Sequence, residues 1–359
     1  MEYDIVIVGA GVMGAATAFY LSKYGKKILL LDQFRVKNTL NSSQDYSRVF
    51  RYEYGDDEFY TNLAVESLKL WKEFERETGR QFYFQCGELL IAESKENYAL
   101  KCYKTLKKLD HPVDLLDEKD LKKRFPQFSA KLGVLDHHGG VLEASSVVES
   151  FVERAKKNGV LILENAKVIR IENDTVFLDG KNIKFKKLVV TCGVWTSKLI
   201  DVPITITKQQ LVYFKPKNIQ NFTKDKFPLF GYLDKGFYGF PIHGIDAVKV
   251  SNHLPGKVVD PDEDDRKVSE DFIESCKSFF RKFIPDLADT EVVKTKVCFY
   301  SMTSDEDFII DKLNDRVIIG AGFSGHGFKF APLIGKILSD LAISGETQYD
   351  ISRFRMNRF

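Results

Sequence analysis

Three glycines near the start of the chain, Gly9, Gly11 and Gly14, are spaced as G-x-G-x-x-G, and Asp32 ends the next apolar run. In a strand–turn–helix unit this spacing is typical of dinucleotide binding. The first glycine permits a tight turn, the second admits a pyrophosphate, and the third lets the helix pack on the strand. An acid roughly 20 residues later binds ribose hydroxyls, which disfavours NADP. The pattern alone leaves NAD and FAD open.

Other residues with chemical potential lie far from this motif. Cys298 interrupts the strand-like run KVCFYSM and is either a plain buried thiol or a covalent anchor for a cofactor. The thiolate is the reactive form, and cations nearby favour it. Strand alternation predicts Lys294 and Lys296 on the same side as Cys298. Arg48 and Arg51 lie in a polar stretch, where each is either a solvated charge or a clamp for a carboxylate.

The overall composition is that of an ordinary globular protein and argues against several classes. The chain has 359 residues, with 53 basic and 51 acidic side chains and a net charge of +2. This near balance gives no general attraction to nucleic acid or acidic lipid. Five cysteines without a C-x-x-C argue against a disulfide framework or a zinc site, and favour a reducing, cytoplasmic setting. No apolar run approaches the ~20 residues of a membrane span, and we expect no metal.

Apolar patterns predict the elements that must position these residues. Residues 5–8 and 26–32 read as buried strands around a helix over 15–24 that ends at Gly25. A polar, irregular stretch follows, and residues 58–79 then form an amphipathic helix. A strand is expected at 87–94, a surface helix at 94–109 and a further helix between Ser145 and Gly159.

The second half of the chain returns to the first sheet after an excursion. Strands with tight turns at 173–174 and 179–180 lead into an apolar strand near 190, and residues 212–253 read as an antiparallel sheet. A helix ends at Pro285, and a buried strand, a glycine-rich turn and a helix reach Ser344. We therefore predict an α/β fold with two interleaved domains. A nucleotide domain comprises 1–83, 143–204 and 305–359, and a β-rich substrate domain comprises 84–142 and 205–304.

With these pieces assembled, nearly the whole chain resembles the D-amino acid oxidase-like family of FAD-dependent oxidoreductases, most closely monomeric sarcosine oxidase and N-methyltryptophan oxidase. The motifs that carry the resemblance are IVGAGVMG, SRVFRYEYG, TCGVWTSKL, FYGFP, KVSNH, VCFY, DFIID and GAGFSGHGFKF. The resemblance implies FAD rather than NAD, and a Rossmann-like domain of the p-hydroxybenzoate hydroxylase type beside an antiparallel substrate domain. It also implies a thioether between Cys298 and the flavin.

The resemblance further implies roles for individual residues. Arg51 and Lys329 would hold a substrate carboxylate. Lys249 would promote the reaction with oxygen, because a fixed cation stabilises the negative charge that oxygen acquires. The other residues carried over as catalytic or substrate-binding are Arg48, Tyr238, His253 and Tyr300. The cofactor-binding set is Gly9, Gly11, Val12, Met13, Gly14, Asp32, Gln33, Ser42, Arg48, Val168, Cys192, Gly193, Trp195, Cys298, Gly322, Gly325, His326, Gly327, Phe328 and Lys329.

The chain departs from the sarcosine oxidases just before its arginine pair. Ser43 and Gln44 stand where two histidines are typical, and Tyr46 replaces an acid. The reaction class is therefore better supported than sarcosine itself as the substrate.

We expect FAD-dependent oxidation of a secondary, N-methyl amino acid, with imine hydrolysis and production of hydrogen peroxide. The partners would be a small amino acid and oxygen, and the protein a monomer or small homo-oligomer. Two alternatives stay open: a flavin-dependent dehydrogenase, for example of L-proline, that uses another electron acceptor, and a non-catalytic nucleotide-binding subunit.

Overall fold

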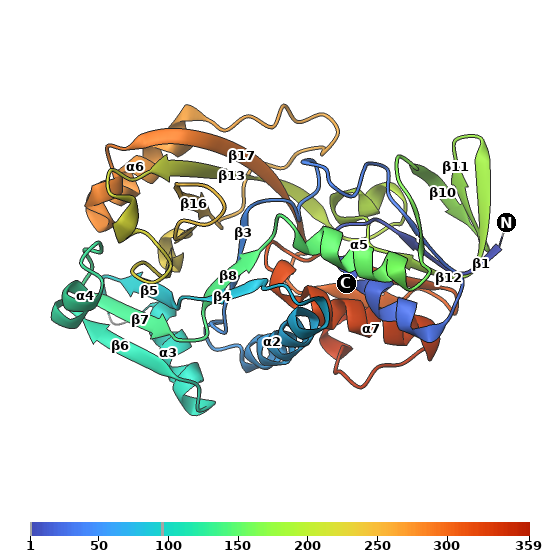
Figure 1. Ribbon diagram of the computed structural model, residues 1–359, viewed down its shortest axis with the longest axis horizontal. Coiled ribbons are helices and arrows are strands. Elements are labelled where there is room, and N and C mark those ends of the chain that lie inside the picture. The colour runs from blue at the N-terminus through green and yellow to red at the C-terminus, as the bar shows by residue number, and fades with distance from the viewer. Residues whose placement is uncertain (1, 95–96) are drawn as a thin grey trace.

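The computed structural model describes residues 2–94 and 97–359 and contains two eight-stranded sheets with a three-stranded sheet between them (Figure 1). In the first sheet, β12, β1, β2 and β9 run parallel in that order, and β19 adds in parallel to β12. Antiparallel strands β10, β11 and β18 complete it. The bounds are β1 (Glu2–Val8), β2 (Ile28–Leu31), β9 (Leu161–Leu163), β10 (Val168–Glu172), β11 (Thr175–Leu178), β12 (Lys181–Val190), β18 (Ile309–Lys312) and β19 (Val317–Ala321).

Helix α1 (Val12–Leu21) is buried along nearly its whole length because α5 (Val147–Lys157) and α7 (Ala331–Ile343) pack against it (Figure 1). The contact with α7 requires small residues. A Cβ added to Gly335 would lie 2.6 Å from the Cβ of Ala16. Helix α2 (Glu58–Thr78) packs beside α7, and its Trp71 indole and Ser67 hydroxyl both donate to the Lys329 carbonyl, at 2.7 and 2.6 Å. These bonds fix the chain that carries the Lys329 side chain.

The second sheet has the order β17-β13-β16-β15-β14-β5-β7-β6. It is antiparallel except between β14 and β5. Its strands are β5 (Glu88–Ala92), β6 (Val113–Asp117), β7 (Leu132–Asp136), β13 (Thr205–Lys215), β14 (Leu229–Tyr232), β15 (Phe237–Phe240), β16 (Val248–Asn252) and β17 (Glu291–Met302), and its helices are α3 (Tyr98–Lys108), α4 (Glu118–Arg124) and α6 (Glu270–Phe283). The phenylalanine-rich face of α6 closes one side of this sheet's core.

The small sheet consists of β3 (Ser47–Phe50), β8 (Gly140–Glu143) and β4 (Tyr83–Gln85), with β8 in the centre. Arg48 lies on β3 opposite Leu142, and Arg51 directly follows the strand. The small sheet lies between the large sheets (Figure 1), and its strand β3 carries Arg48 and leads directly into Arg51.

Most expected elements are present, with four differences. The first helix begins at Val12 rather than residue 15, since Gly11 is its N-cap residue. The stretch expected to be irregular contains β3, whose pairing with distant β8 no local pattern announces. The substrate sheet has one parallel pair. The helix expected over 94–109 runs from Tyr98 to Lys108, and residues 95–96 lie outside the described part of the chain.

The strands of the first sheet all come from the ranges predicted for the nucleotide domain, and those of the second sheet from the ranges predicted for the substrate domain. The division into two domains stays a prediction. Within residues 2–94 and 97–359, no helix has the length and apolar character needed to cross a membrane. The same residues contain no group of His, Cys, Asp and Glu side chains placed to hold a metal ion.

Candidate active site

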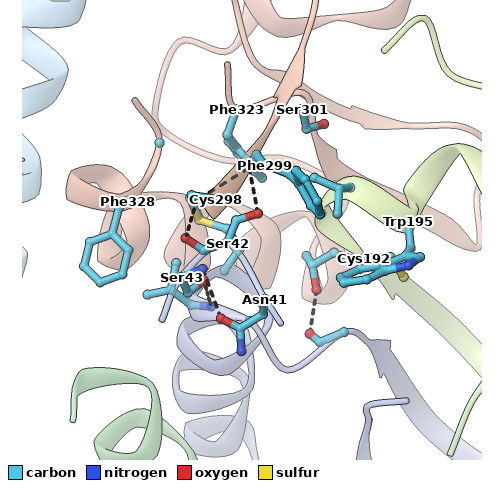
Figure 2. Close-up of a pocket in the computed structure, with 18 of the residues that line it drawn as sticks. Asn41, Ser42, Ser43, Cys192, Trp195, Cys298, Phe299, Ser301, Phe323 and Phe328 are labelled. Carbon is cyan, nitrogen blue, oxygen red and sulfur yellow. Dashed lines mark hydrogen bonds between the residues drawn. The ribbon is translucent and has the colours of Figure 1, made fainter. Parts of the chain in front are cut away.

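A cavity of about 1070 Å³ is lined by residues from both eight-stranded sheets and from the loops between them (Figure 2). This volume is at the upper end for ligand sites. It suits a large cofactor together with a small substrate.

The glycine turn at one end of the cavity needs residues without side chains. Gly9 has φ of 99°, and a Cβ there would lie 2.4 Å from the Thr191 carbonyl oxygen. A Cβ on Gly14 would lie 1.8 Å from the Gly9 carbonyl oxygen, so Gly14 serves packing and does not line the cavity. Gly11 does line the cavity, and a Cβ added there would meet Ser43 Oγ as its nearest atom, at 3.5 Å. The space beside Gly11 fits a pyrophosphate.

Asp32 and Ser43 hold this turn in shape. Asp32 Oδ2 accepts from the Ala10 amide at 2.6 Å, and its Oδ1 accepts from the Phe34 amide at 2.8 Å. Burial raises the pKa of Asp32, and these two amides oppose the rise. Ser43 Oγ accepts from the Val12 amide at 3.0 Å, which satisfies one free donor of the α1 N-terminus. Asp32 thus stabilises the turn as well as lining the cavity.

Most residues assigned to the cofactor from the sequence line this one cavity. Gly14 and Gly322 are the exceptions. Gly322 has φ of 61°, and a Cβ there would lie 2.6 Å from a Thr303 methyl carbon, so it turns the chain behind the wall. The lining members are Gly9, Gly11, Val12, Met13, Asp32, Gln33, Ser42, Arg48, Val168, Cys192, Gly193, Trp195, Cys298, Gly325, His326, Gly327, Phe328 and Lys329.

Cys298 projects from β17 toward the cavity with 9% of its surface exposed. Its Sγ lies 3.6 Å from the Ser42 carbonyl oxygen, and the Ser42 hydroxyl donates to the Phe299 carbonyl at 2.8 Å (Figure 2). Lys296 Nζ donates a hydrogen bond to the Gln44 carbonyl, and Lys294 Nζ donates one to Tyr46 Oη at 3.1 Å. Lys294, Lys296 and Cys298 therefore all face the segment of residues 42–46, as strand alternation predicts.

The glycine-rich turn after β19 carries Lys329, and its side chain lies near Arg51. Lys329 Nζ donates to Tyr54 Oη and to the His326 carbonyl, both at 2.8 Å. Arg51 Nη1 donates to the Glu53 carbonyl at 2.8 Å. Both cations line the cavity. Burial and the Arg51 charge hold the pKa of Lys329 well below its ordinary value, so an incoming anion would favour its protonated form.

Three further side chains assigned to the substrate pocket lie together. Tyr238 Oη and Tyr300 Oη are 3.2 Å apart, and the ring of His253 lies 5.8 Å from that of Tyr300. Burial, followed by the charges of Arg51 and Lys329, lowers the pKa of His253 to about 4. His253 is consequently a neutral ring at physiological pH.

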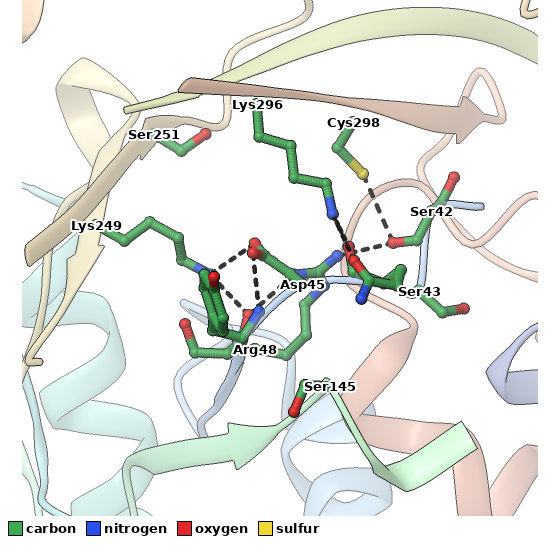
Figure 3. A network of polar contacts seen from close by, with 12 residues as sticks. Ser42, Ser43, Asp45, Arg48, Ser145, Lys249, Ser251, Lys296 and Cys298 are labelled. Carbon is green, nitrogen blue, oxygen red and sulfur yellow. Dashed lines mark hydrogen bonds and ion pairs between the residues drawn. The ribbon is translucent and has the colours of Figure 1, made fainter. Parts of the chain in front are cut away.

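Lys249 and Arg48 share a carboxylate that sequence reasoning missed. Lys249 Nζ lies 3.1 Å and Arg48 Nη1 3.0 Å from Asp45 Oδ2 (Figure 3). Burial lowers the pKa of Lys249 to about 7 even though Asp45 opposes the shift. Burial by itself would raise the pKa of Asp45, yet Lys249 and Arg48 hold it far below its ordinary value. Asp45 is charged at any working pH.

A second missed group is a cluster of buried acids near Arg51, formed by Glu53, Glu88 and Asp136. Glu88 lines the cavity, and burial raises its pKa to about 7 while Arg51 opposes the rise. Burial also raises the pKa of Glu53 well above its ordinary value, and Glu88 and Asp136 raise it further. The sequence contains one signal for this cluster, the acid Glu88 at the start of the apolar run ELLIA.

The three residues that depart from the sarcosine oxidases differ in position. Ser43 lines the cavity, whereas Gln44 and Tyr46 lie behind its wall. There they accept hydrogen bonds from Lys296 and Lys294.

The chain belongs to the family of FAD-dependent oxidoreductases, because the family model described as "FAD dependent oxidoreductase" matches residues 4–341. Among similar proteins, peroxisomal sarcosine oxidase of Homo sapiens is 34% identical over 380 residues, covering 99% of this chain and 96% of the relative. Monomeric sarcosine oxidase of Bacillus sp. (strain B-0618) is 33% identical over 376 residues, with the same coverage of 99% and 96%.

The solved structure of L-proline dehydrogenase from P. horikoshii superposes with a TM-score of 0.87 at 22% identity, covering 100% of this chain and 98% of that one. At this identity the likeness concerns the fold alone. The predicted family and fold class are confirmed, and the chain is an FAD-dependent oxidoreductase enzyme. The glycine turn, Asp32 and the long cavity fit FAD.

Proposed function

We propose that this protein oxidises a secondary, N-methyl amino acid such as sarcosine and passes the electrons to oxygen. The observation that carries the proposal is the pair of cations, Arg51 and Lys329, on the wall of the cavity that fits FAD. When bound, FAD accepts a hydride from the carbon next to the amine nitrogen and delivers two electrons to oxygen, so that amine, oxygen and water yield a carbonyl compound, a smaller amine and hydrogen peroxide.

The protein's own residues bind and orient the substrate. Arg51 offers its guanidinium to the substrate carboxylate, and Lys329 adds a second charged donor. Tyr238 and Tyr300 form a polar edge of the same pocket. His253 is neutral and therefore does not repel the substrate's ammonium form. A fixed carboxylate orients the adjacent carbon–nitrogen unit for reaction.

Cys298 is the residue we propose for covalent attachment of the flavin through a thioether. Its sulfur is at the cavity wall, and the half-buried Lys296 side chain projects from the same face of β17. We expect acid-denatured protein to stay yellow, and Cys298→Ser to release its flavin into the supernatant. Cys276→Ser, at a buried thiol that does not line the cavity, is the control. Flavin retained by the Cys298→Ser chain would contradict the attachment.

Lys249 is the residue we propose for the reaction with oxygen, because it is the buried ammonium that lines the cavity beside Arg48. The amine class is tested by offering sarcosine, N-methyl-L-tryptophan, glycine and L-proline under air, with oxygen uptake and peroxide measured together. Equal amounts of oxygen consumed and peroxide formed would support an oxidase.

A flavin-dependent amino acid dehydrogenase is the second candidate. One feature favours it: Lys249 donates its two hydrogen bonds to protein acceptors, the Asp45 carboxylate and the Ser47 carbonyl. Rapid bleaching of the flavin by substrate without oxygen, turnover with an artificial dye and no peroxide under air would establish this alternative.

A further inference from the structure

Asp45 is almost completely buried, with 4% of its surface exposed, and both carboxylate oxygens are fully engaged. Oδ2 receives Lys249 Nζ at 3.1 Å and Arg48 Nη1 at 3.0 Å. Oδ1 receives the Tyr46 amide at 2.9 Å and the Tyr213 hydroxyl. Such complete satisfaction holds a buried carboxylate in one geometry and in its charged state.

The sheet places the partners of Asp45 in one cross-strand row. Lys249 on β16 pairs with Tyr213 on β13 and with Phe240 on β15. Lys249 Nζ lies 3.6 Å from the centre of the Phe240 ring and donates to the Ser47 carbonyl at 2.6 Å. Its side chain is 2% exposed. Lys249 lines the cavity, whereas Asp45 lies behind it.

We propose that Asp45 is a positioning residue that favours the ammonium form of Lys249 and fixes it at the cavity wall, and so controls the reaction with oxygen without touching cofactor or substrate. The inference rests on the oxygen role assigned to Lys249 under the proposed function. In that step oxygen takes two electrons from the reduced cofactor and two protons, giving hydrogen peroxide. A fixed positive charge lowers the barrier because negative charge reaches oxygen first.

In the described part of the chain, the two other charged groups that most affect Lys249 work against its charge. Arg48 approaches from β3, and Lys296 approaches from β17; both are cations that lower the pKa of Lys249. Tyr213 on β13 is a neutral phenol, since burial and Asp45 raise its pKa. Without the carboxylate, burial and two cations would leave a neutral amine hydrogen-bonded to a carbonyl. Arg48 would remain charged, but it would lose its carboxylate partner.

The first test measures the charge of Lys249 without any turnover. The holoenzyme, with no substrate present, is treated with trace acetic anhydride across pH 5 to 10, and modification of Lys249 is measured by peptide mass spectrometry, since only the neutral amine reacts. We expect Asp45→Asn to move the midpoint for Lys249 down by about one pH unit or more, as loss of an adjacent opposite charge requires. Asp45→Glu should restore part of the shift. Asp114→Asn, at a surface pair with Arg124, is the control.

The second test separates the two half-reactions of the holoenzyme. Asp45→Asn should slow reoxidation by oxygen at pH 8 about tenfold or more, and leave anaerobic reduction by substrate within about twofold, because one preorganised charge is worth at least this much. Tyr213→Phe removes one hydrogen bond but no charge, and should give a smaller change of the same kind. It keeps the test available if Asp45→Asn does not fold.

The outcomes are distinguishable. An unchanged labelling midpoint in Asp45→Asn and Tyr213→Phe, or equal slowing of both half-reactions, would overturn the role of Asp45. Absence of peroxide from the unsubstituted enzyme would refute the proposed oxidase function instead, and the labelling experiment would still decide whether Asp45 holds the Lys249 charge.

Discussion

Two buried charged clusters border the same cavity and are built in opposite ways. The Asp45 cluster, formed by Asp45, Arg48, Tyr213 and Lys249, has one carboxylate for two cations, and both of its carboxylate oxygens are hydrogen-bonded (Figure 3). The acid cluster has three carboxyl groups, Glu53, Glu88 and Asp136. Among the described residues, neither oxygen of Glu53 nor Oε2 of Glu88 has a hydrogen-bond partner.

The difference separates a fixed charge from an adjustable one. A buried carboxylate with donors on both oxygens stays ionised, whereas one without donors takes up a proton. Asp136 lies between the two kinds, because burial raises its pKa while the amides of Tyr52 and His138, which donate to it at 3.1 and 2.8 Å, oppose the rise. Glu88 is of the second kind. The Asp45 carboxylate is therefore suited to holding a constant charge behind the cavity wall, and Glu88 to responding when an anion arrives.

Removing the Lys249 cation from the Asp45 cluster should have the largest effect. Lys249→Met is expected to slow reoxidation by oxygen about 10²- to 10³-fold, the loss typical of one preorganised electrostatic contact. Reduction by substrate should change little. Stopped-flow absorbance of each half-reaction measures the two rates, and Lys336→Met, at an ion pair on α7, is the matched control. If both rates fell together, the charge of Lys249 would not be specific to the oxygen step.

Arg51→Gln tests the side of the cavity next to the acid cluster, and a smaller effect is expected. A lost charge-assisted contact to a buried carboxylate costs about 2 kcal/mol or more, which is roughly a 30-fold rise in KM for an amino acid substrate. Arg124→Gln, on the surface, should leave KM unchanged. Equal KM values for Arg51→Gln and the unsubstituted enzyme would move the carboxylate site elsewhere in the cavity.

The parts of the site that could be predicted are those with a local pattern. The glycine turn, Asp32 and the facing of Lys294, Lys296 and Cys298 follow from spacing and from the period of a strand. Arg51 and Lys329 could be joined only by resemblance, since Lys329 lies 278 positions after Arg51 and no local pattern pairs them.

The charged clusters could not be predicted because their burial is a tertiary property. Asp45 lies in a polar stretch that would be solvated by itself, and it is buried because Tyr213 and Lys249 of the second sheet cover it. Glu88 begins an apolar strand, and its neighbours Glu53 and Asp136 come from separate segments. Sequence indicated the elements but not which charges they enclose.

Glu88→Gln tests the acid cluster, and it should have the smallest effect of the three substitutions, a change in how the Kd of a carboxylate inhibitor depends on pH. The pKa of Glu88, raised by burial to about 7 against the influence of Arg51, should rise further when a substrate carboxylate adds negative charge. Binding then takes up a proton. In the unsubstituted enzyme proton uptake by Glu88 should make the Kd of a carboxylate inhibitor rise above pH 7, and this single group adds at most about tenfold per pH unit by linkage.

In Glu88→Gln that rise should be reduced several-fold at pH 8.5, because no proton needs to be taken up at this position. Lys249, with a pKa of about 7, and Lys329 titrate in both proteins, so the difference between the two curves isolates Glu88. Flavin absorbance reports Kd, and a pH indicator in weak buffer reports the proton. Glu93→Gln, at an ion pair with Lys282, is the control. Identical curves and no proton uptake would show that the acid cluster has a charge as fixed as that of Asp45.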